Sequence, residues 1–455
     1  MSVPAVIEQV LTKHEITFNI VDAHPSAGHF GVARSTLLQD SQGKVQAIYP
    51  AGSILDVDAI NRLTGRDLKA TPQSDIESLC AKAQLKNLPA IPKALGLEFI
   101  IDQTLLEHSD LQLDSGNEQS IVNVSGEQFK LLVGDATTGS IAVAEDQLQA
   151  GPLDNTQDLE QITTAVANFT QLRIKQRLEE TLEFPPLPDT AQRIIKLRVD
   201  PNADIKDLTD IVESDPSLAA QVVSWAASPY YAAPGKIKSV HDAIVRVLGF
   251  DLVLNLSLGL ALGKTMSLPK DAAKGFTPYW EQAVYAATAV EALVGAIPPK
   301  QRPTMGMAYL SGLLHNFGYL ILAEVFPPHF SSICRYQEAN PFSNHTFIER
   351  HLLGVTREQL GSWLMRSWNM PEEVCDALRF QADAGYDGDN NQYAKLLYIA
   401  MRMLRSHGIG DAPLATIPDS LFEELHLDRE KATDAMEKMM ESSAELNLMA
   451  ANMAA

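Results

Sequence analysis

The spacing of hydrophobic and polar positions changes along the chain. Up to about residue 150, short apolar segments of strand type are separated by turn residues, as at Asp40-Ser41-Gln42-Gly43. From Asp189 onward, apolar residues recur at intervals typical of amphipathic helices. The pattern therefore predicts a multidomain chain with an N-terminal α/β part, built as a mixed sheet with helices, and an all-helical C-terminal part.

The first part of the chain predicts both strands and helices. Helical spacing predicts helices over Val6–Lys13, Asp56–Thr64 and Asp75–Ala83. The expected strands are all short and are Thr17–Val21, Thr36–Gln39, Val45–Tyr49, Phe99–Asp102, Ile121–Val124, Phe129–Val133 and Ser140–Ala144.

A connecting helix is expected between the two parts. Ala150-Gly151-Pro152 breaks the strand pattern, and Asp158 to Glu183 then carries one apolar stripe. Prolines from Pro185 onward stop this helix because proline cannot continue one. We therefore predict four segments: a domain over 1–150, a connecting helix over 151–183, a helical domain over 184–388 and a helical extension over 389–455.

Capping residues place helix starts in the C-terminal part. Asp204 and Ser239 are expected N-caps, and Asp215 is followed by Pro216 at the first helical position, where its missing N–H costs nothing. Further helices are expected near 279–295, 304–325, 343–352, 356–368, 371–382 and 391–406, and a last one from Asp428 to Asn447.

Charge narrows the possible partners. The 455 residues include 36 Lys+Arg against 57 Asp+Glu, a net charge of −21. The first 150 residues contain 10 basic and 19 acidic side chains, so both parts are acidic. Because nucleic-acid backbones are anionic, this balance argues against nucleic-acid binding.

The length of the apolar segments and the cysteine pattern predict the cellular compartment of the protein. No apolar run approaches the roughly 20 residues that cross a bilayer, so no membrane partner is expected. The N-terminus lacks the pattern of a secretory signal. Cys80, Cys334 and Cys375 form no C-x-x-C pair and are odd in number, which favours a reduced, cytoplasmic protein.

Two stretches of the N-terminal part carry a family pattern. They are Ser35-Thr36-Leu37-Leu38-Gln39-Asp40, followed by Val45 to Pro50, and Pro89 to Leu97, leading into Phe99 to Leu105. Over residues 1–148 the chain resembles the YbaK/ProX-type domain, the editing fold that deacylates mischarged aminoacyl-tRNA.

The resemblance implies a site that this chain has altered. The lysine position of the family falls on Ser35, preceded by Arg34, and Pro92 lies in the proline-containing loop. Asn87-Leu88 replaces the usual glycine pair. Serine brings neither the charge nor the reach of lysine, so we expect these positions to be degenerate.

A longer, ordered set of motifs spans residues 178–385. It consists of Phe184-Pro185-Pro186-Leu187-Pro188, Asp215-Pro216-Ser217-Leu218-Ala219, Ser228-Pro229-Tyr230-Tyr231, Ile237 to Ile244, Leu248-Gly249, Gly312-Leu313-Leu314-His315-Asn316-Phe317-Gly318 and Trp368-Asn369-Met370-Pro371. This set resembles the HDOD domain, a helical relative of the HD phosphohydrolases that is found in bacterial signalling proteins.

The resemblance to HD enzymes implies a metal site with His, His-Asp and Asp ligands. Here the corresponding positions read Gln282, His315-Asn316 and, downstream, Gln381. Neutral amides are poor ligands for a divalent ion, so we expect no metal, no cofactor and no catalytic residue. His315 follows two leucines and fits a buried, hydrogen-bonded histidine.

Three functions follow from these readings. The first is a non-catalytic signalling scaffold or sensor that binds another signalling protein or a small ligand. The second is a trans-editing deacylase for tRNA that uses Arg34 or Ser35. The third is a metal-dependent phosphohydrolase with a site near His315. The oligomeric state stays open.

Overall fold

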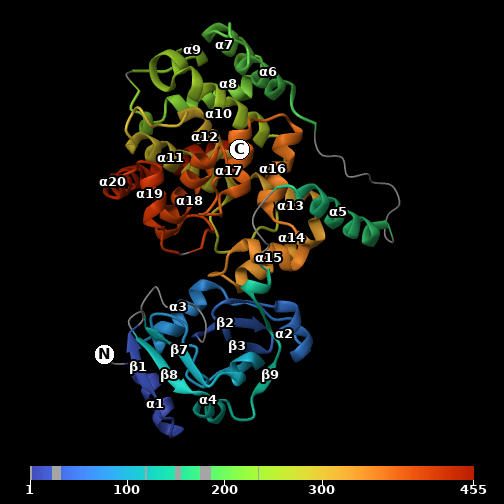
Figure 1. The fold of residues 1–455 in the computed structure, drawn as a ribbon, viewed down its shortest axis with the longest axis vertical. Coiled ribbons are helices and arrows are strands. Elements are labelled where there is room, and N and C mark those ends of the chain that lie inside the picture. Colours follow the sequence, from blue (N-terminus) through green and yellow to red (C-terminus); the bar gives the residue numbers. More distant parts are fainter. Residues whose placement is uncertain are drawn as a thin grey trace. The chain divides into compact units, whose positions relative to one another are not determined.

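The computed structural model describes residues 3–22, 32–117, 120–148, 155–174, 186–233, 235–413 and 415–454. They form two compact units (Figure 1). Unit 1 comprises Met1–Ala150, Asp271–Gly275 and Ser331–Leu352. Unit 2 comprises Gly151–Lys270, Phe276–Phe330 and Leu353–Ala455.

Unit 1 is built on a mixed β-sheet. Its described strands pair in the order β1-β8-β7-β2-β3-β6-β9, with β5 beside β2, and β10 pairs separately with β4. Strands β2 and β3 form an antiparallel hairpin. On its two sides, β7 runs parallel to β2 and β6 runs parallel to β3. The strands are β1 (Asn19–Asp22), β2 (Val32–Asp40), β3 (Gly43–Pro50), β4 (Ser53–Leu55), β5 (Lys69–Ala70), β6 (Glu98–Asp102), β7 (Asp110–Asn117), β8 (Ser120–Ser125), β9 (Thr137–Gly139) and β10 (Ala142–Ala144).

Helices accompany the sheet, which confirms the predicted α/β class. They are α1 (Ala5–Lys13), α2 (Val57–Thr64), α3 (Gln73–Lys82) and α4 (Gly126–Val133), with the 3₁₀ turns η1 (Gln103–Glu107) and η2 (Glu145–Leu148). Buried residues of α1, β3, β6, β7, β8 and α4 share one apolar core, among them Ile7, Ile48, Ile101 and Phe129.

One predicted strand is wrong. Phe129–Val133 belongs to α4, which begins after Ser125, whose hydroxyl accepts the N–H of Gln128. The helix buries Phe129, Leu132 and Val133 and leaves Leu131 largely exposed, which is helical periodicity. The N-cap therefore decides the conformation of a short apolar run that, read alone, fits either element.

A segment from the later chain completes unit 1. It contains the end of α14 (Pro327–Ala339) and most of α15 (His345–Leu353). The Asn340 side chain pairs with β4 as a strand would: Leu55 N–H donates to its Oδ1 over 2.6 Å, and its Nδ2 donates to Leu55 O over 3.1 Å. Thr36 of β2 donates its hydroxyl to Ala339 O over 3.1 Å.

Asp56 fastens α2 to the same segment. Its carboxylate caps α2 and accepts the Tyr336 hydroxyl over 2.7 Å. His351 Nε2 lies 3.6 Å from its Oδ2. Burial alone would raise the pKa of Asp56, but the contacts with His351 and Tyr336 lower that pKa well below its usual range. The carboxylate is therefore ionised whenever unit 1 is folded near neutral pH.

Among its described residues, unit 2 is built from helices joined by turns and loops, as predicted. Its helices are α5 (Asp158–Ile174), α6 (Asp189–Arg198), α7 (Ile205–Glu213), α8 (Pro216–Ala226), α9 (Val240–Ala243), α10 (Phe250–Gly263), α11 (Tyr279–Ala296), α12 (Met305–Leu314), α13 (Phe317–Val325), α16 (Arg357–Ser367), α17 (Glu372–Phe380), α18 (Asn391–Ser406), α19 (Asp419–Glu424), α20 (Arg429–Met440) and α21 (Ser443–Ala454). The single turns are η3 (Pro229–Tyr231) and η4 (Ile244–Leu248).

The predicted caps hold, but two expected helices are broken. Asp204, Asp215 and Ser239 each accept backbone N–H groups at a helix start. The helix expected near 304–325 divides into α12 and α13 at His315-Asn316, and the last one divides into α20 and α21. Of the expected connecting helix, α5 is described, and residues 175–183 lie outside the described residues.

One helical stretch is more apolar than the sequence reading anticipated. Among the described residues, Val240–Gly263 has the length and composition of a segment that could cross a membrane. Charged side chains such as Asp242 and Arg246 interrupt its apolar run, which is why the run looks short. Much of it is buried within unit 2, as expected of a core helix.

The Asn340 contact predicts a local loss of protection. Replacing Asn340 with Leu leaves the buried N–H and C=O of Leu55 without these bonds and should lower the stability of unit 1 by about 2 kcal/mol. Hydrogen exchange measured by mass spectrometry should show faster exchange at β4. Gln42→Ala, on the exposed β2–β3 turn, is the control and should leave β4 unchanged; equal exchange in both variants would contradict the assignment.

Glu291 predicts a pH dependence in unit 2. The Tyr231 hydroxyl donates to its Oε2 over 3.2 Å, and burial raises the pKa of Glu291 to about 7. A carboxyl whose pKa is raised by folding stabilises the fold below its unfolded pKa of about 4.3, and this contribution is lost as the pH rises through about 7. The Tm of the wild type should therefore fall more between pH 5 and 8 than that of Glu291→Gln, whereas exposed Glu430→Gln should follow the wild type. Parallel curves for all three proteins would refute this.

Candidate functional site

The four altered HD positions lie together in unit 2. Gln282 is on α11, His315-Asn316 separates α12 from α13, and Gln381 follows α17. Asn316 Nδ2 donates to Gln282 Oε1 over 3.2 Å, and Gln381 Nε2 donates to His315 O over 2.8 Å. Gln282 in turn donates to Thr277 O over 2.6 Å. These hydrogen bonds join the four positions into one polar centre.

His315 is buried, as expected from its apolar neighbours. Its Nδ1 lies 2.8 Å from Gly312 O, one turn earlier on α12. The two glycines of the surrounding motif allow helices to approach closely: a Cβ on Gly312 would lie 2.6 Å from Ala287 Cα, and one on Gly318 would lie 1.8 Å from Arg357 O. The motif is thus explained largely by packing.

Arg357 supplies a positive charge to this centre. Its Nη1 donates to Asn316 Oδ1 over 3.1 Å and lies 2.8 Å from Asp411 Oδ2. Its guanidinium carbon is 5.2 Å from the ring centroid of Tyr319. The side chain is only 3% exposed, so these contacts replace its hydration.

Sequence reasoning missed Arg357, although one signal was available. A cation at the first position of a helix is unfavourable for the helix dipole, and Arg357 begins α16. Such a residue therefore needs a specific counter-charge, here Asp411, which lies 54 residues away and outside the motifs. Only the fold could supply that partner.

The residues present do not fit the divalent metal of HD enzymes. Three of the positions carry neutral amides, which bring no charge to a dication. Asn316 Oδ1, at the position of the aspartate ligand, accepts a hydrogen bond from a guanidinium instead. A fixed cation at this distance would repel a second one. The centre can hold helices together, but it lacks the donor set for metal-activated water.

The altered deacylase positions lie in unit 1. Ser35 is buried on β2, and its hydroxyl donates to Pro89 O over 3.0 Å. Gln46 on β3 donates to the same carbonyl over 2.6 Å. Pro92 is buried in the loop that follows. The serine therefore anchors the proline-containing loop to the sheet.

Arg34 contacts a different part of unit 1. Its guanidinium carbon lies 5.8 Å from the ring centroid of Phe342. Burial raises the pKa of Asp114 on β7, while the Gly116 N–H and the charge of Arg34 oppose that shift. The charge of Arg34 thus offsets a small part of the shift at Asp114, and the lysine of the deacylase family has no counterpart among these contacts.

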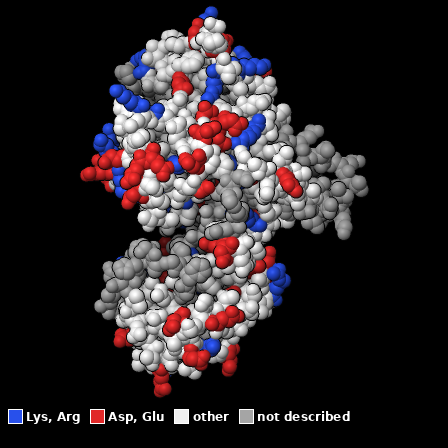
Figure 2. All heavy atoms as spheres, in the orientation of Figure 1, with Lys and Arg blue, Asp and Glu red and all other residues white. Residues whose placement is uncertain are grey.

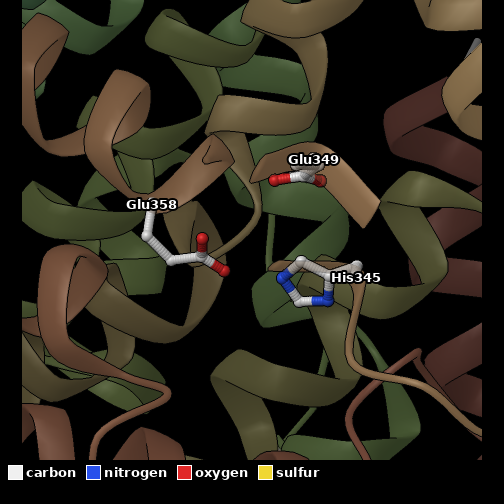
Figure 3. Close-up of side chains that lie close together, drawn as sticks. All are labelled: His345, Glu349 and Glu358. Carbon is white, nitrogen blue, oxygen red and sulfur yellow. The ribbon is translucent and has the colours of Figure 1, made fainter. Parts of the chain in front are cut away.

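Residues of types that ligate metals also occur on α15, apart from the altered HD and deacylase positions. His345 and Glu349 are four residues apart and so lie on one helix face, and Glu349 is fully buried (Figure 3). Glu358, the third residue labelled in Figure 3, is on α16 and belongs to unit 2. Sequence reasoning singled out none of these residues, although the spacing of His345 and Glu349 is visible in the sequence.

The surface is consistent with the acidic composition. Figure 2 shows acidic side chains on the viewed face, including a group over α19 and α20. Exposed members of these helices include Asp419, Glu423 and Glu430. Lys and Arg side chains also lie on the viewed face.

A solved structure that matches the whole chain agrees with the fold of both units. The HDOD domain family matches residues 184–384. A solved candidate signal transduction protein from Marinobacter aquaeolei VT8 is 42% identical, covers 100% of both chains and superposes with a TM-score of 0.91. A solved candidate trans-editing enzyme for prolyl tRNA synthetase is 14% identical and covers 30% of this chain and 96% of its own, with a TM-score of 0.27.

A curated relative matches only part of this chain. An uncharacterized protein of Treponema pallidum (strain Nichols) is 22% identical over 265 residues, which are 58% of this chain. The chain spans about half the length of that relative.

The burial of Arg357 predicts a large effect on unit 2. Arg357→Met keeps the length of the side chain but leaves Asp411 and Asn316 without their donor, so the free energy of unfolding should fall by about 3 kcal/mol. All four tryptophans belong to unit 2, so their fluorescence in urea reports this unit. Arg246→Met is the matched control, because the Arg246–Asp242 pair is at the surface and should contribute less than about 1 kcal/mol. Equal losses would show that Arg357 is not a central contact.

Proposed function

The chain belongs to the HDOD domain proteins, and we propose that it is a signal transduction protein whose HDOD domain acts as a non-catalytic scaffold or sensor. The expected partner is another signalling protein or a small ligand, met in the cytoplasm. The full-length similarity to a candidate signal transduction protein supports the broad role.

One observation carries the non-catalytic part of the proposal. The position of the HD aspartate is Asn316, and its carbonyl oxygen bonds to the buried guanidinium of Arg357. The positive charge in this centre is therefore the side chain of Arg357 and not a bound metal ion. A protein that has replaced a dissociable metal by an arginine retains the helical framework without the means to activate water.

The same reasoning applies to the deacylase-like fold of unit 1. Ser35 uses its hydroxyl to hold the loop at Pro89, and Arg34 lies against Phe342. Neither group offers the free ammonium that the family resemblance associates with the reaction. Unit 1 then serves as a second binding or signalling element, and its acidity disfavours tRNA.

Metal binding and turnover test the proposal. The wild-type chain should bind no Mn²⁺ in calorimetric titration and should not hydrolyse a cyclic dinucleotide. The variant Gln282→His with Asn316→Asp should still bind Mn²⁺ poorly because Arg357 remains. Adding Arg357→Ala to those two changes should tighten binding at least about tenfold, since it removes the competing charge.

The alternatives give different results. Stoichiometric Mn²⁺ bound by the wild type, with phosphoester hydrolysis, would replace the proposal with a phosphohydrolase. Release of amino acid from a mischarged tRNA by the wild type, lost in Ser35→Ala, would replace it with a trans-editing deacylase. The folding of each variant is checked by circular dichroism.

A further inference from the structure

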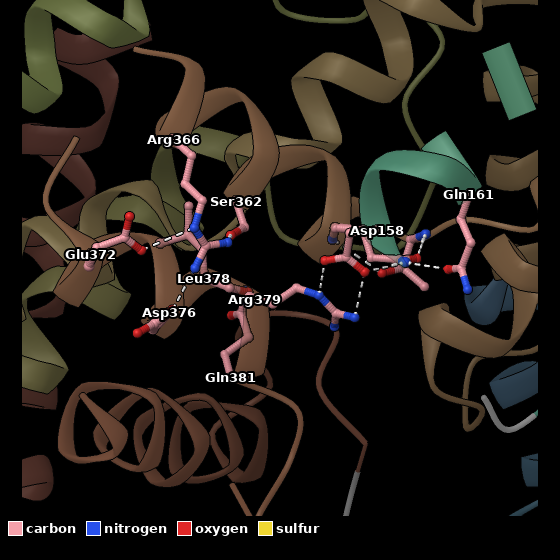
Figure 4. Close-up of polar contacts among 11 residues, drawn as sticks. Asp158, Gln161, Ser362, Arg366, Glu372, Asp376, Leu378, Arg379 and Gln381 are labelled. Atoms are coloured by element: carbon pink, nitrogen blue, oxygen red, sulfur yellow. Dashed lines mark hydrogen bonds and ion pairs between the residues drawn. The ribbon is translucent and has the colours of Figure 1, made fainter. Parts of the chain in front are cut away.

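A second buried polar cluster lies on α16 and α17, where it receives a carboxylate from α5 (Figure 4). Arg379 binds Asp158 through two nitrogens: Nε bonds to Oδ2, and Nη2 lies 2.8 Å from Oδ1. Gln359 Nε2 also donates to Asp158 Oδ1, over 2.8 Å. All three residues are buried. The arrangement is a bidentate arginine–carboxylate pair with an additional amide donor.

The N-terminal capping box of α16 holds the Gln359 side chain of this cluster in place. The Thr356 N–H donates to Gln359 Oε1 over 3.0 Å, and the Gln359 N–H donates to the Thr356 hydroxyl over 3.4 Å. This capping box fixes the Gln359 amide so that its NH₂ group points at Asp158. Gln359 and Arg379 are therefore held as two donors that converge on one carboxylate.

A neighbouring arginine shows a different arrangement. Arg366 of α16 pairs with Glu372 and Asp376 of α17 and donates to Ser362 of its own helix (Figure 4). Its counter-charges thus come from the same helical pair. The carboxylate bound by Arg379 comes from a helix more than 200 residues earlier in the chain.

Among its described side chains, helix α5 buries a single narrow face. Asp158, Ile162 and Ala165 are buried, and they share one helix face. Leu159, by contrast, is 60% exposed. The helix therefore presents one acidic group followed by two apolar groups at the fourth and seventh positions, as a short helical ligand would.

We propose that Gln359 and Arg379 form a carboxylate-binding site that Asp158 fills as an internal ligand, and that an acidic helical segment of a partner protein displaces α5 from it. The partner segment has the chemistry of α5: an Asp or Glu followed by small or branched apolar residues four and seven positions later. The inference rests on the proposed role of the HDOD domain in binding a partner. It assigns the partner class and gives the domain a closed and an open form.

Competition with a peptide tests the site in the full-length chain. A fluorescent peptide of residues 155–174 serves as the probe, and its binding is measured by anisotropy. The Asp158→Ala and Asp158→Asn chains should bind it at least about tenfold more tightly than the wild type, because their own α5 lacks the carboxylate. A peptide with Asp158→Asn should bind these chains at least about tenfold more weakly than the natural peptide.

Two controls separate the site from general destabilisation. Glu160→Gln removes an exposed carboxylate two residues along α5 and should behave as the wild type. Adding Arg379→Ala to the Asp158→Asn chain should abolish peptide binding while circular dichroism stays helical.

Several results would overturn the site. They are equal binding by the wild-type and Asp158 variant chains, equal binding of the natural and Asp158→Asn peptides, and no binding by either Asp158 variant. The proposed function fails separately, through metal binding or turnover by the wild type, and neither result depends on the peptide.

Discussion

The buried guanidinium of Arg357 is the interaction on which unit 2 depends most. It joins the start of α13, through Asn316, to the start of α16 and to Asp411 beyond α18. Without solvent around it, the charge is tolerable only while all these groups hold their positions. The contact therefore couples the positions of Asn316, the start of α16 and Asp411.

Buried polar side chains play the same part in both units, where they form hydrogen bonds with their neighbours. In unit 1, Ser35 and Gln46 both donate to the Pro89 carbonyl; in unit 2, Gln282, Asn316 and Arg357 satisfy one another. Each of these side chains takes part in a structural hydrogen bond. Such bonding is expected of buried polar groups, which are seldom left without a partner.

Much of this could be predicted from the sequence, and the failures have physical reasons. Caps such as Asp215 act over a few residues, so the sequence places helix starts well. The run Phe129–Val133 holds four apolar residues and Lys130, and a run this short fits both periods. The altered HD positions were found through their motifs, but Arg357 and Asp411 belong to no motif, and their pairing is a tertiary contact. The association of Asn340 with Leu55, 285 residues apart, likewise leaves no periodic trace.

The contribution of Ser331–Leu352 to unit 1 has a consequence for biosynthesis. A chain emerging from the ribosome exposes its N-terminal residues first, and domains usually fold in that order. Here Ala339 and Asn340 bond to β2 and β4, so unit 1 cannot complete these contacts until most of the helical unit has been translated. During that interval the N–H and C=O groups of Leu55 lack their Asn340 partner, and the Thr36 hydroxyl lacks the Ala339 carbonyl.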